Sequence, residues 1–141
     1  MDELLDKITV MLGGRAAEKV IFDTLSTGAS DDIMRASELA RRMVTEYGMS
    51  EKLGSVRYAG QQMQYLGGAI QDDSQISPDT RQLIDSEVQR IVTDQYKLAC
   101  ACLLEHRGAL ENLTTQLLHQ ETVDGSAVKE ALASESAQPA A

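Results

Sequence analysis

The stretch from Ser26 to Gly48 constrains the fold of this chain more than any other, because it carries the most regular hydrophobic period. Its apolar residues recur three and four positions apart, which places them on one face of a helix. They are Ala29, Ile33, Ala36, Ala40, Met43, Val44 and Tyr47. Gly48 follows the last turn, where a left-handed residue commonly ends a helix. The stretch therefore predicts an amphipathic helix with chemically marked ends.

Two neighbouring carboxylates, Asp31 and Asp32, lie in the first turn of this predicted helix. The unpaired backbone amides and the positive end of the helix dipole favour negative charge at that position. One interpretation is that the pair only stabilises the start of the helix. The other is that one of the two binds a ligand, and the helical pattern alone does not decide between them.

A longer motif extends on both sides of the acidic pair. The run LGGRAAEKVIF, followed by STGASDDIMRASELARRMVTEYGMSEKLG, resembles the C-terminal half of the peptidase domain of the FtsH family, the membrane-anchored ATP-dependent zinc metalloproteases of bacteria, mitochondria and chloroplasts. The resemblance reaches from about Leu4 to Leu132 and includes SPDTRQLIDSEVQRIV and LLHQETVDGSAVKEAL. It implies that residues 1–133 are part of an M41-type peptidase domain. It also implies that Asp32 is the third protein ligand of a catalytic zinc whose two His ligands come from an upstream His-Glu-x-x-His helix.

The sequence holds only part of that site. Its two histidines, His106 and His119, lack the His-Glu-x-x-His spacing, and no phosphate-binding loop of the Gly-x-x-x-x-Gly-Lys type is present. The resemblance therefore assigns the His ligands, the general base and the ATPase module to residues other than these 141. Glu18 is a candidate for orienting a His ligand, and a plain surface role fits it equally well. Asp31, where the family often has Asn, is a second candidate for a residue that supports the zinc ligand without binding the metal itself.

The composition favours an all-α fold in one domain. Only 4% of the residues are aromatic, beside 43% hydrophobic residues that are mostly aliphatic, which suits helices packed through aliphatic stripes. A net charge of −9 argues against binding to nucleic acid or to an anionic membrane surface. No apolar run approaches the roughly 18 residues that span a bilayer, so the chain as written is expected to be soluble.

The first half of the chain predicts one further helix and one irregular segment. The helix spans residues 3–22, and its interior Gly13 and Gly14 suggest that another backbone comes close; a kink or a loop between two shorter helices is the alternative. The irregular loop segment covers about residues 49–77, with a short strand at 56–58. In the FtsH family the corresponding region lies near the substrate entrance, which gives Tyr65 and Leu66 a role there.

The second half completes a compact bundle of about five helices. Ser77 and Pro78 are a natural cap and first helical residue for a long third helix, which Gly108 breaks. A fourth and a fifth short helix follow, and His106 and His119 are expected at solvated helix ends. The last residues, 134–141, have no periodicity and predict a disordered tail.

The function that the resemblance implies is peptide-bond hydrolysis with zinc as the cofactor and Asp32 as one of its ligands. The implied partners are FtsH-type subunits in a homo- or hetero-hexamer and unfolded polypeptides or membrane proteins as substrates, with ATP used only by the absent ATPase module. The family's protease domain lies in the bacterial cytoplasm, the mitochondrion or the chloroplast, and any membrane contact would come from transmembrane segments outside this sequence. This chain alone is predicted to hydrolyse nothing.

Two other functions stay open at this point. A free-standing relative would keep the helical body and join protease hexamers as a non-catalytic structural or regulatory subunit. A helical adaptor unrelated to proteolysis is the third reading. Without the zinc-binding helix, the strip of Ile33, Ala36 and Ala40 is expected to be exposed and to promote association.

Overall fold

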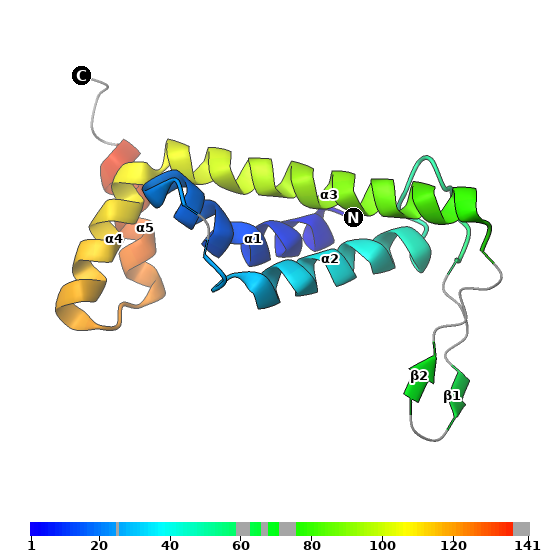
Figure 1. The fold of residues 1–141 in the computed structure, drawn as a ribbon. Coiled ribbons are helices and arrows are strands. Elements are labelled where there is room, and N and C mark those ends of the chain that lie inside the picture. The colour runs from blue at the N-terminus through cyan, green and yellow to red at the C-terminus, as the bar shows by residue number, and fades with distance from the viewer. Residues whose placement is uncertain (25, 59–62, 66–67, 71–75, 137–141) are drawn as a thin grey trace.

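The computed structural model describes residues 1–24, 26–58, 63–65, 68–70 and 76–136. These residues form five helices and one two-stranded hairpin (Figure 1). The elements are α1 (Asp2–Phe22), α2 (Ser30–Thr45), β1 (Met63–Tyr65), β2 (Gly68–Ile70), α3 (Pro78–Glu105), α4 (Arg107–Gln120) and α5 (Gly125–Ser136). The predicted all-α class and the count of five helices are confirmed.

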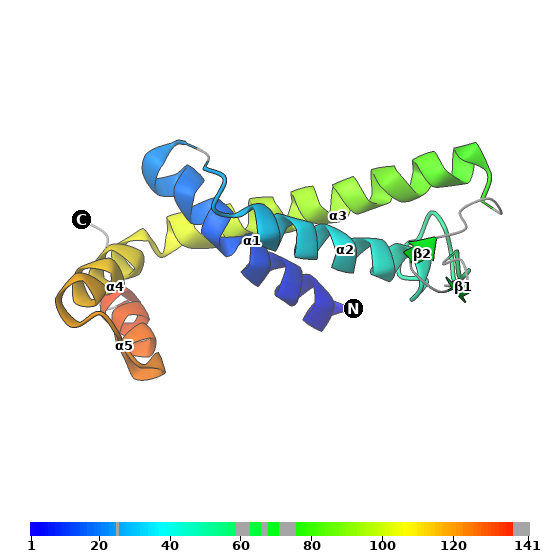
Figure 2. The same ribbon diagram turned by 60° about the horizontal axis from the view of Figure 1, so that its bottom comes forward.

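The body of the molecule is a three-helix layer in which α1 and α2 pack against each other and against the long helix α3 (Figures 1 and 2). One hydrophobic cluster joins the three helices and the turn after α2. Its buried members are Ile8, Leu12, Ala36, Ala40, Met43, Val44, Leu53, Ile84, Val88 and Ile91. The helix α2 buries Ala36, Ala40, Met43 and Val44 of the face that its period predicts, whereas Tyr47 lies after the helix and is 43% exposed.

The expected exposed strip on α2 is wrong. Ala36 and Ala40 are both 0% exposed, and Ile33 is half-buried against the core cluster. Their small side chains allow α1 and α3 to approach α2 closely, and this close packing closes the core within the described residues. The strip on α2 is therefore covered by its two neighbouring helices.

The first helix is continuous through its two glycines. Ile8, Leu12 and Ala16, four residues apart, are its buried residues and face the core. A Cβ added at Gly13 or Gly14 would meet no atom within 4 Å outside the local helix, so none of the described residues approaches this point closely. The alternative of a break into two shorter helices is not what the structure has.

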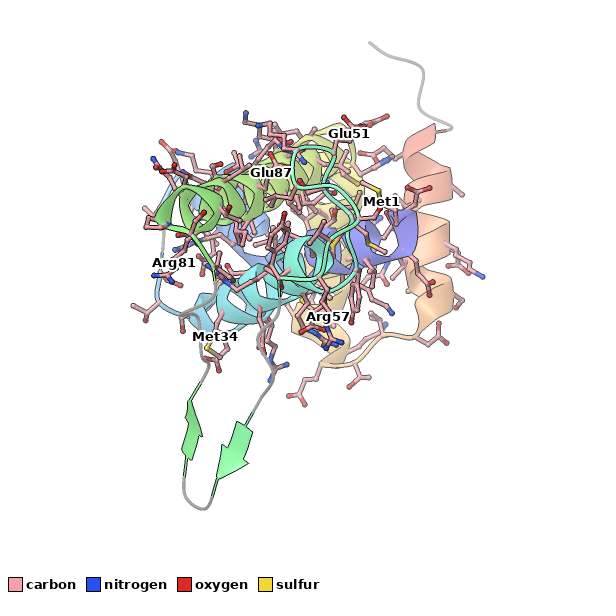
Figure 3. All side chains as sticks on the ribbon, turned by 90° about the vertical axis from the view of Figure 1, so that its right-hand side faces the viewer. Met1, Met34, Glu51, Arg57, Arg81 and Glu87 are labelled. Carbon is pink, nitrogen blue, oxygen red and sulfur yellow. The ribbon has the colours of Figure 1, made fainter. Side chains whose placement is uncertain are left out.

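The turn after α2 is held tightly to the end of α2. Gly48 has the left-handed φ of 63° that its position predicts, and the amide of Met49 then donates to the Met43 carbonyl at 3.0 Å. The strand expected at 56–58 is wrong: the backbone there is irregular, and the Tyr58 amide donates instead to the Thr45 carbonyl at 2.7 Å. Among the described residues, the strands are β1 and β2, an antiparallel pair that lies beyond the helical body (Figures 1 and 3).

The long helix α3 starts as predicted and ends slightly earlier. The Ser77 hydroxyl accepts from the Thr80 amide at 3.2 Å, with Pro78 at the first helical position. The break between α3 and α4 falls at His106 rather than at Gly108, which lies in the first turn of α4. No helix of the described residues is long and apolar enough to cross a membrane.

The last two helices form a hairpin at the opposite end of α3 from the strands (Figure 1). Among the described elements, α5 packs against α4 alone. Glu135 fastens the pair, because its carboxylate accepts from the Gly108 amide at 2.9 Å and lies 3.1 Å from His106 Nδ1. The helix α5 reaches Ser136, three residues into the expected tail, and residues 137–141 lie outside the described residues.

Candidate functional site

The first turn of α2 presents the acidic pair to solvent. Asp31 and Asp32 are both exposed, at the second and third positions of the helix. Neither carboxylate makes a hydrogen bond or an ion pair with any residue that the structure describes. A carboxylate at this position is compatible with the helix dipole and keeps its oxygen lone pairs available to a cation. The structure therefore leaves the predicted ligand Asp32 open.

Glu18, near the end of α1, is fully engaged with the connector to α2. The Ser26 hydroxyl donates to Oε1 of Glu18, and the Ser26 amide donates to Oε2 at 3.2 Å. Arg15 Nη1 lies 3.4 Å from the same Oε2. The hydroxyl and amide of Ser26, with Arg15, hold the pKa of the Glu18 carboxyl below its usual value because they stabilise the ionised form. In this structure Glu18 thus orders the backbone just before Asp32.

The two histidines lie on other elements. His106 is at the junction of α3 and α4, where its ring pairs with Glu135, and His119 is exposed in the last turn of α4. Both are at helix ends, as predicted. Within the described ranges, no three His, Cys, Asp or Glu side chains gather so as to hold a metal ion. Of the residues given a role near the substrate entrance, Tyr65 lies in β1 and Leu66 lies outside the described residues.

The carboxylates of Asp32 and Glu18 differ in how well they suit a zinc ion. Zinc in proteins takes Cys, His and carboxylate ligands, most often four in total including water at catalytic sites. Asp32 is an exposed carboxylate with no described partner, which suits one such ligand position. Glu18 does not suit direct ligation as it stands, since both of its oxygens already accept hydrogen bonds. Among the described residues, the donor set thus offers Asp32 as a candidate for one zinc ligand and no complete metal site.

Sequence reasoning missed Glu87, the most deeply buried charged residue in the part of the chain that the structure describes. Its side chain lies on the core face of α3, 1% exposed, beside the turn that carries Glu51 (Figure 3). Ser50 Oγ donates to it at 2.9 Å, Arg90 Nη2 at 3.1 Å, and Lys52 Nζ lies 3.1 Å away. Arg90 above all, against the effect of burial and with help from Lys52 and Ser50, lowers the pKa of Glu87 to about 2.

The burial of Glu87 could have been inferred from its position among the apolar residues of α3. It is three residues after Ile84 and four before Ile91, where a fully buried position is expected to be apolar. A charged residue there needs several partners, and Arg90 at i+3 is one that the sequence shows. The other two come from the turn after α2, so only the fold brings them together.

Comparison with known proteins gives one consistent result. The family model of peptidase family M41 matches residues 1–131. The chain is 48% identical over 120 residues, 85% of its length, to the ATP-dependent zinc metalloprotease FtsH of Thermus thermophilus. It is 45% identical over 129 residues to the protein of that name from Bacillus subtilis, and 39% identical over 138 residues to that from Cupriavidus metallidurans. The matches cover 19–21% of those relatives, so the chain spans about a fifth of their length.

Proposed function

Because this chain belongs to peptidase family M41, we propose that it is part of an ATP-dependent zinc metalloendopeptidase and that Asp32 supplies the third protein ligand of the zinc. The observation that carries the proposal is the open carboxylate of Asp32 in the first turn of α2, within the matched residues. The relatives at 39–48% identity are named as ATP-dependent zinc metalloproteases, which supports the same activity. The substrates are unfolded polypeptides or membrane proteins.

In this proposal the chain's own residues bind the metal through Asp32 and orient that carboxylate. Asp32 holds one position of the metal, and the packing of α2 between α1 and α3 keeps that carboxylate at one point on the surface. When bound, zinc would polarise a water molecule and the scissile carbonyl. The remaining ligands and the general base come from residues outside this sequence. The isolated chain therefore hydrolyses no peptide bond, and zinc is held only in the complete protease.

The partners proposed are further FtsH-type subunits in a homo- or hetero-hexamer. ATP acts through an ATPase module that these 141 residues do not contain. The helices α1–α3 and the α4–α5 hairpin would then provide the helical body of the peptidase ring. Asp31, next to the ligand, adds a second negative charge that strengthens the attraction of the site for a cation.

Substitution of Asp32 tests the metal role most directly. In the complete polypeptide that the source cell makes from this sequence, Asp32→Asn is expected to lower zinc content and casein hydrolysis at least 10-fold, since a carboxylate ligand is lost. Asp79→Asn is the matched control, because Asp79 is an exposed Asp in the first turn of α3. Zinc is measured by mass spectrometry of the protein after gel filtration. An Asp32→Asn protein that keeps its zinc and activity refutes the assignment.

The isolated chain gives the second test. Residues 1–141 incubated with zinc and casein are expected to release no peptides, and hydrolysis that a chelator abolishes would refute the predicted inactivity. The intact mass of the endogenous polypeptide then shows whether further segments accompany it. A mass several times 15.4 kDa supports the protease assignment.

A non-catalytic subunit is the second candidate function. It is favoured by the core, because within the described residues α1 and α3 are enough to bury Ala36 and Ala40 fully. Such a subunit would join protease hexamers as a structural or regulatory member. An endogenous mass near 15.4 kDa together with co-migration of the chain with a full-length protease on native gels would favour this function over the first.

A further inference from the structure

The connector between α1 and α2 is fastened by a cluster of three side chains, Arg15, Glu18 and Ser26, which we call the connector brace. Arg15 Nη1 donates to the Ser26 carbonyl at 2.7 Å and lies 3.4 Å from Glu18 Oε2. Ser26 returns two donors, its amide and its hydroxyl, to the Glu18 carboxylate. The carbonyl, the amide and the hydroxyl of Ser26 therefore all bond side chains of α1.

The brace acts directly on the start of α2. The Ser26 hydroxyl accepts from the Gly28 amide at 3.1 Å, and the Thr27 carbonyl accepts from the Ser30 amide at 3.1 Å. Gly28 fits closely there, since a Cβ on it would lie 3.3 Å from Ser26 Oγ. A continuous series of hydrogen bonds thus runs from α1 through Ser26 to the first helical residue, two positions before Asp32.

The helix α2 has no side-chain cap of its own. Its N-cap residue is Ala29, which makes no capping hydrogen bond and is only 6% exposed. Helices that begin without a Ser, Thr, Asp or Asn cap tend to fray in the first turn. In α2 the brace supplies the order that a cap would otherwise provide. The side chains of Arg15 and Glu18 are 23% and 26% exposed, so both are partly covered by the connector and by α1.

We propose that Arg15 is a positioning residue for Asp32: it holds the Ser26 carbonyl and the Glu18 carboxylate, and through them it fixes the first turn of α2 so that the Asp32 carboxylate meets zinc at one place. The proposal rests on the assignment of Asp32 as a zinc ligand. A guanidinium suits the task because its planar set of donors can contact a carbonyl and a carboxylate at once. Metal sites are sensitive to such support, and loss of groups that orient a ligand typically weakens metal binding about 10–100-fold.

The test measures zinc affinity in the complete polypeptide by competition with a chromophoric chelator. Arg15→Gln is expected to weaken zinc binding about 10-fold, and Arg15→Lys, which keeps a charged donor, is expected to weaken it less. Arg107→Gln is the matched control, because Arg107 also pairs with a Glu on its own helix, Glu111 at 3.0 Å, on the exposed surface of α4. Zinc affinity in Arg15→Gln that equals that of Arg107→Gln would overturn the proposal.

A second readout separates positioning from general stability. In residues 1–141, Arg15→Gln is expected to speed amide hydrogen exchange at residues 28–32 while exchange in the core of α3 stays unchanged. If Arg15→Gln fails to fold, Ser26→Ala decides instead, since it removes only the hydroxyl that bonds Glu18 and Gly28. Unchanged zinc affinity and exchange in a folded Ser26→Ala protein would overturn the proposal.

Zinc binding by the Asp32→Asn and Arg15 variants separates the positioning role of Arg15 from the ligand role of Asp32. If Asp32→Asn loses zinc and the Arg15 variants keep it, Asp32 is a ligand that needs no brace. If Asp32→Asn itself keeps zinc, the assignment of the ligand is wrong and the positioning role is overturned with it.

Discussion

The two ends of α2 are held in place by different chemistry. At its N-terminal end, the connector brace of Arg15, Glu18 and Ser26 joins side chains that are partly or fully exposed. At its C-terminal end, the turn after the helix is fastened to Glu87, whose carboxylate is buried in the core of the three-helix body (Figure 3). Both ends rely on one Glu that accepts hydrogen bonds from a Ser in a connecting segment.

The difference between the two lies in burial and therefore in what each one does. We call Glu87 and its partners Ser50, Lys52 and Arg90 the buried clamp. Removing a partner leaves an uncompensated charge in the core, and removing Glu87 leaves a cavity. The buried clamp therefore contributes to the stability of the whole three-helix body. Groups at the exposed end can turn to water when their partners are removed, so the brace contributes little to global stability. The connector brace instead orders the backbone at the start of α2, where Asp32 lies in the first turn.

The largest effect is expected when the buried clamp is removed. Glu87→Ala in residues 1–141 should lower the free energy of unfolding by about 2–3 kcal/mol, because Ser50 loses its acceptor and a core side chain is deleted. Urea unfolding followed by circular dichroism measures the change. Glu111→Ala is the control, since Glu111 makes a comparable pair with Arg107 on the exposed face of α4. Equal losses in the two variants would contradict the distinction between buried and exposed pairs.

The same clamp predicts a dependence on pH. The pKa of Glu87 is lowered from 4.5 to about 2, chiefly by Arg90, so the ionised carboxylate stabilises the folded state at pH above 4.5. This stabilisation is lost as the pH falls from 4.5 toward about 2. The free energy of unfolding of the parent chain should therefore fall more steeply over that range than that of Glu87→Gln. Urea unfolding at a series of pH values tests this, and parallel curves would contradict it.

The turn beside the clamp offers a comparison between two glycines. Gly48 and Gly54 have φ values of 63° and 68°, but an added Cβ lies 2.9 Å from the Ser55 Cα only at Gly48. Gly48→Ala should cost about 2 kcal/mol or more, whereas Gly54→Ala should cost about 1 kcal/mol, the conformational penalty that both share. Thermal unfolding of the two variants measures the difference. Equal costs would mean that the turn relaxes away from the clash.

Much of the fold follows from local pattern in the sequence. The three-and-four spacing in residues 29–47 predicts the buried face of α2, and Ser77 with Pro78 predicts the start of α3, because both depend on interactions within a few residues. The sequence pattern places the break between α3 and α4 at Gly108, two residues after its position at His106 in the structure. Gly108 is instead the position where the absence of a Cβ leaves room for Glu135, which comes from α5.

The contacts that hold α2 in the fold were harder to predict, because they join residues far apart in the chain. Glu87 and Ser50 are 37 positions apart, and no period in either segment indicates the contact. The expected exposure of Ala36 and Ala40 was wrong for the same reason: their burial depends on how closely α1 and α3 approach. Asp32 was found through the resemblance, and its role as a zinc ligand stays a prediction.

The smallest effect on stability is expected at the exposed end of α2. Ser26→Ala should change the free energy of unfolding by no more than about 1 kcal/mol, because Ser26 is exposed and water can replace its hydroxyl as a partner of Glu18. Amide exchange at Gly28 should nevertheless increase, since that amide loses its acceptor. Ser86→Ala is the control, because among the described residues the Ser86 hydroxyl bonds the Leu83 carbonyl of its own helix and no other group. A loss of stability in Ser26→Ala as large as that in Glu87→Ala would show that both ends of α2 support the whole fold.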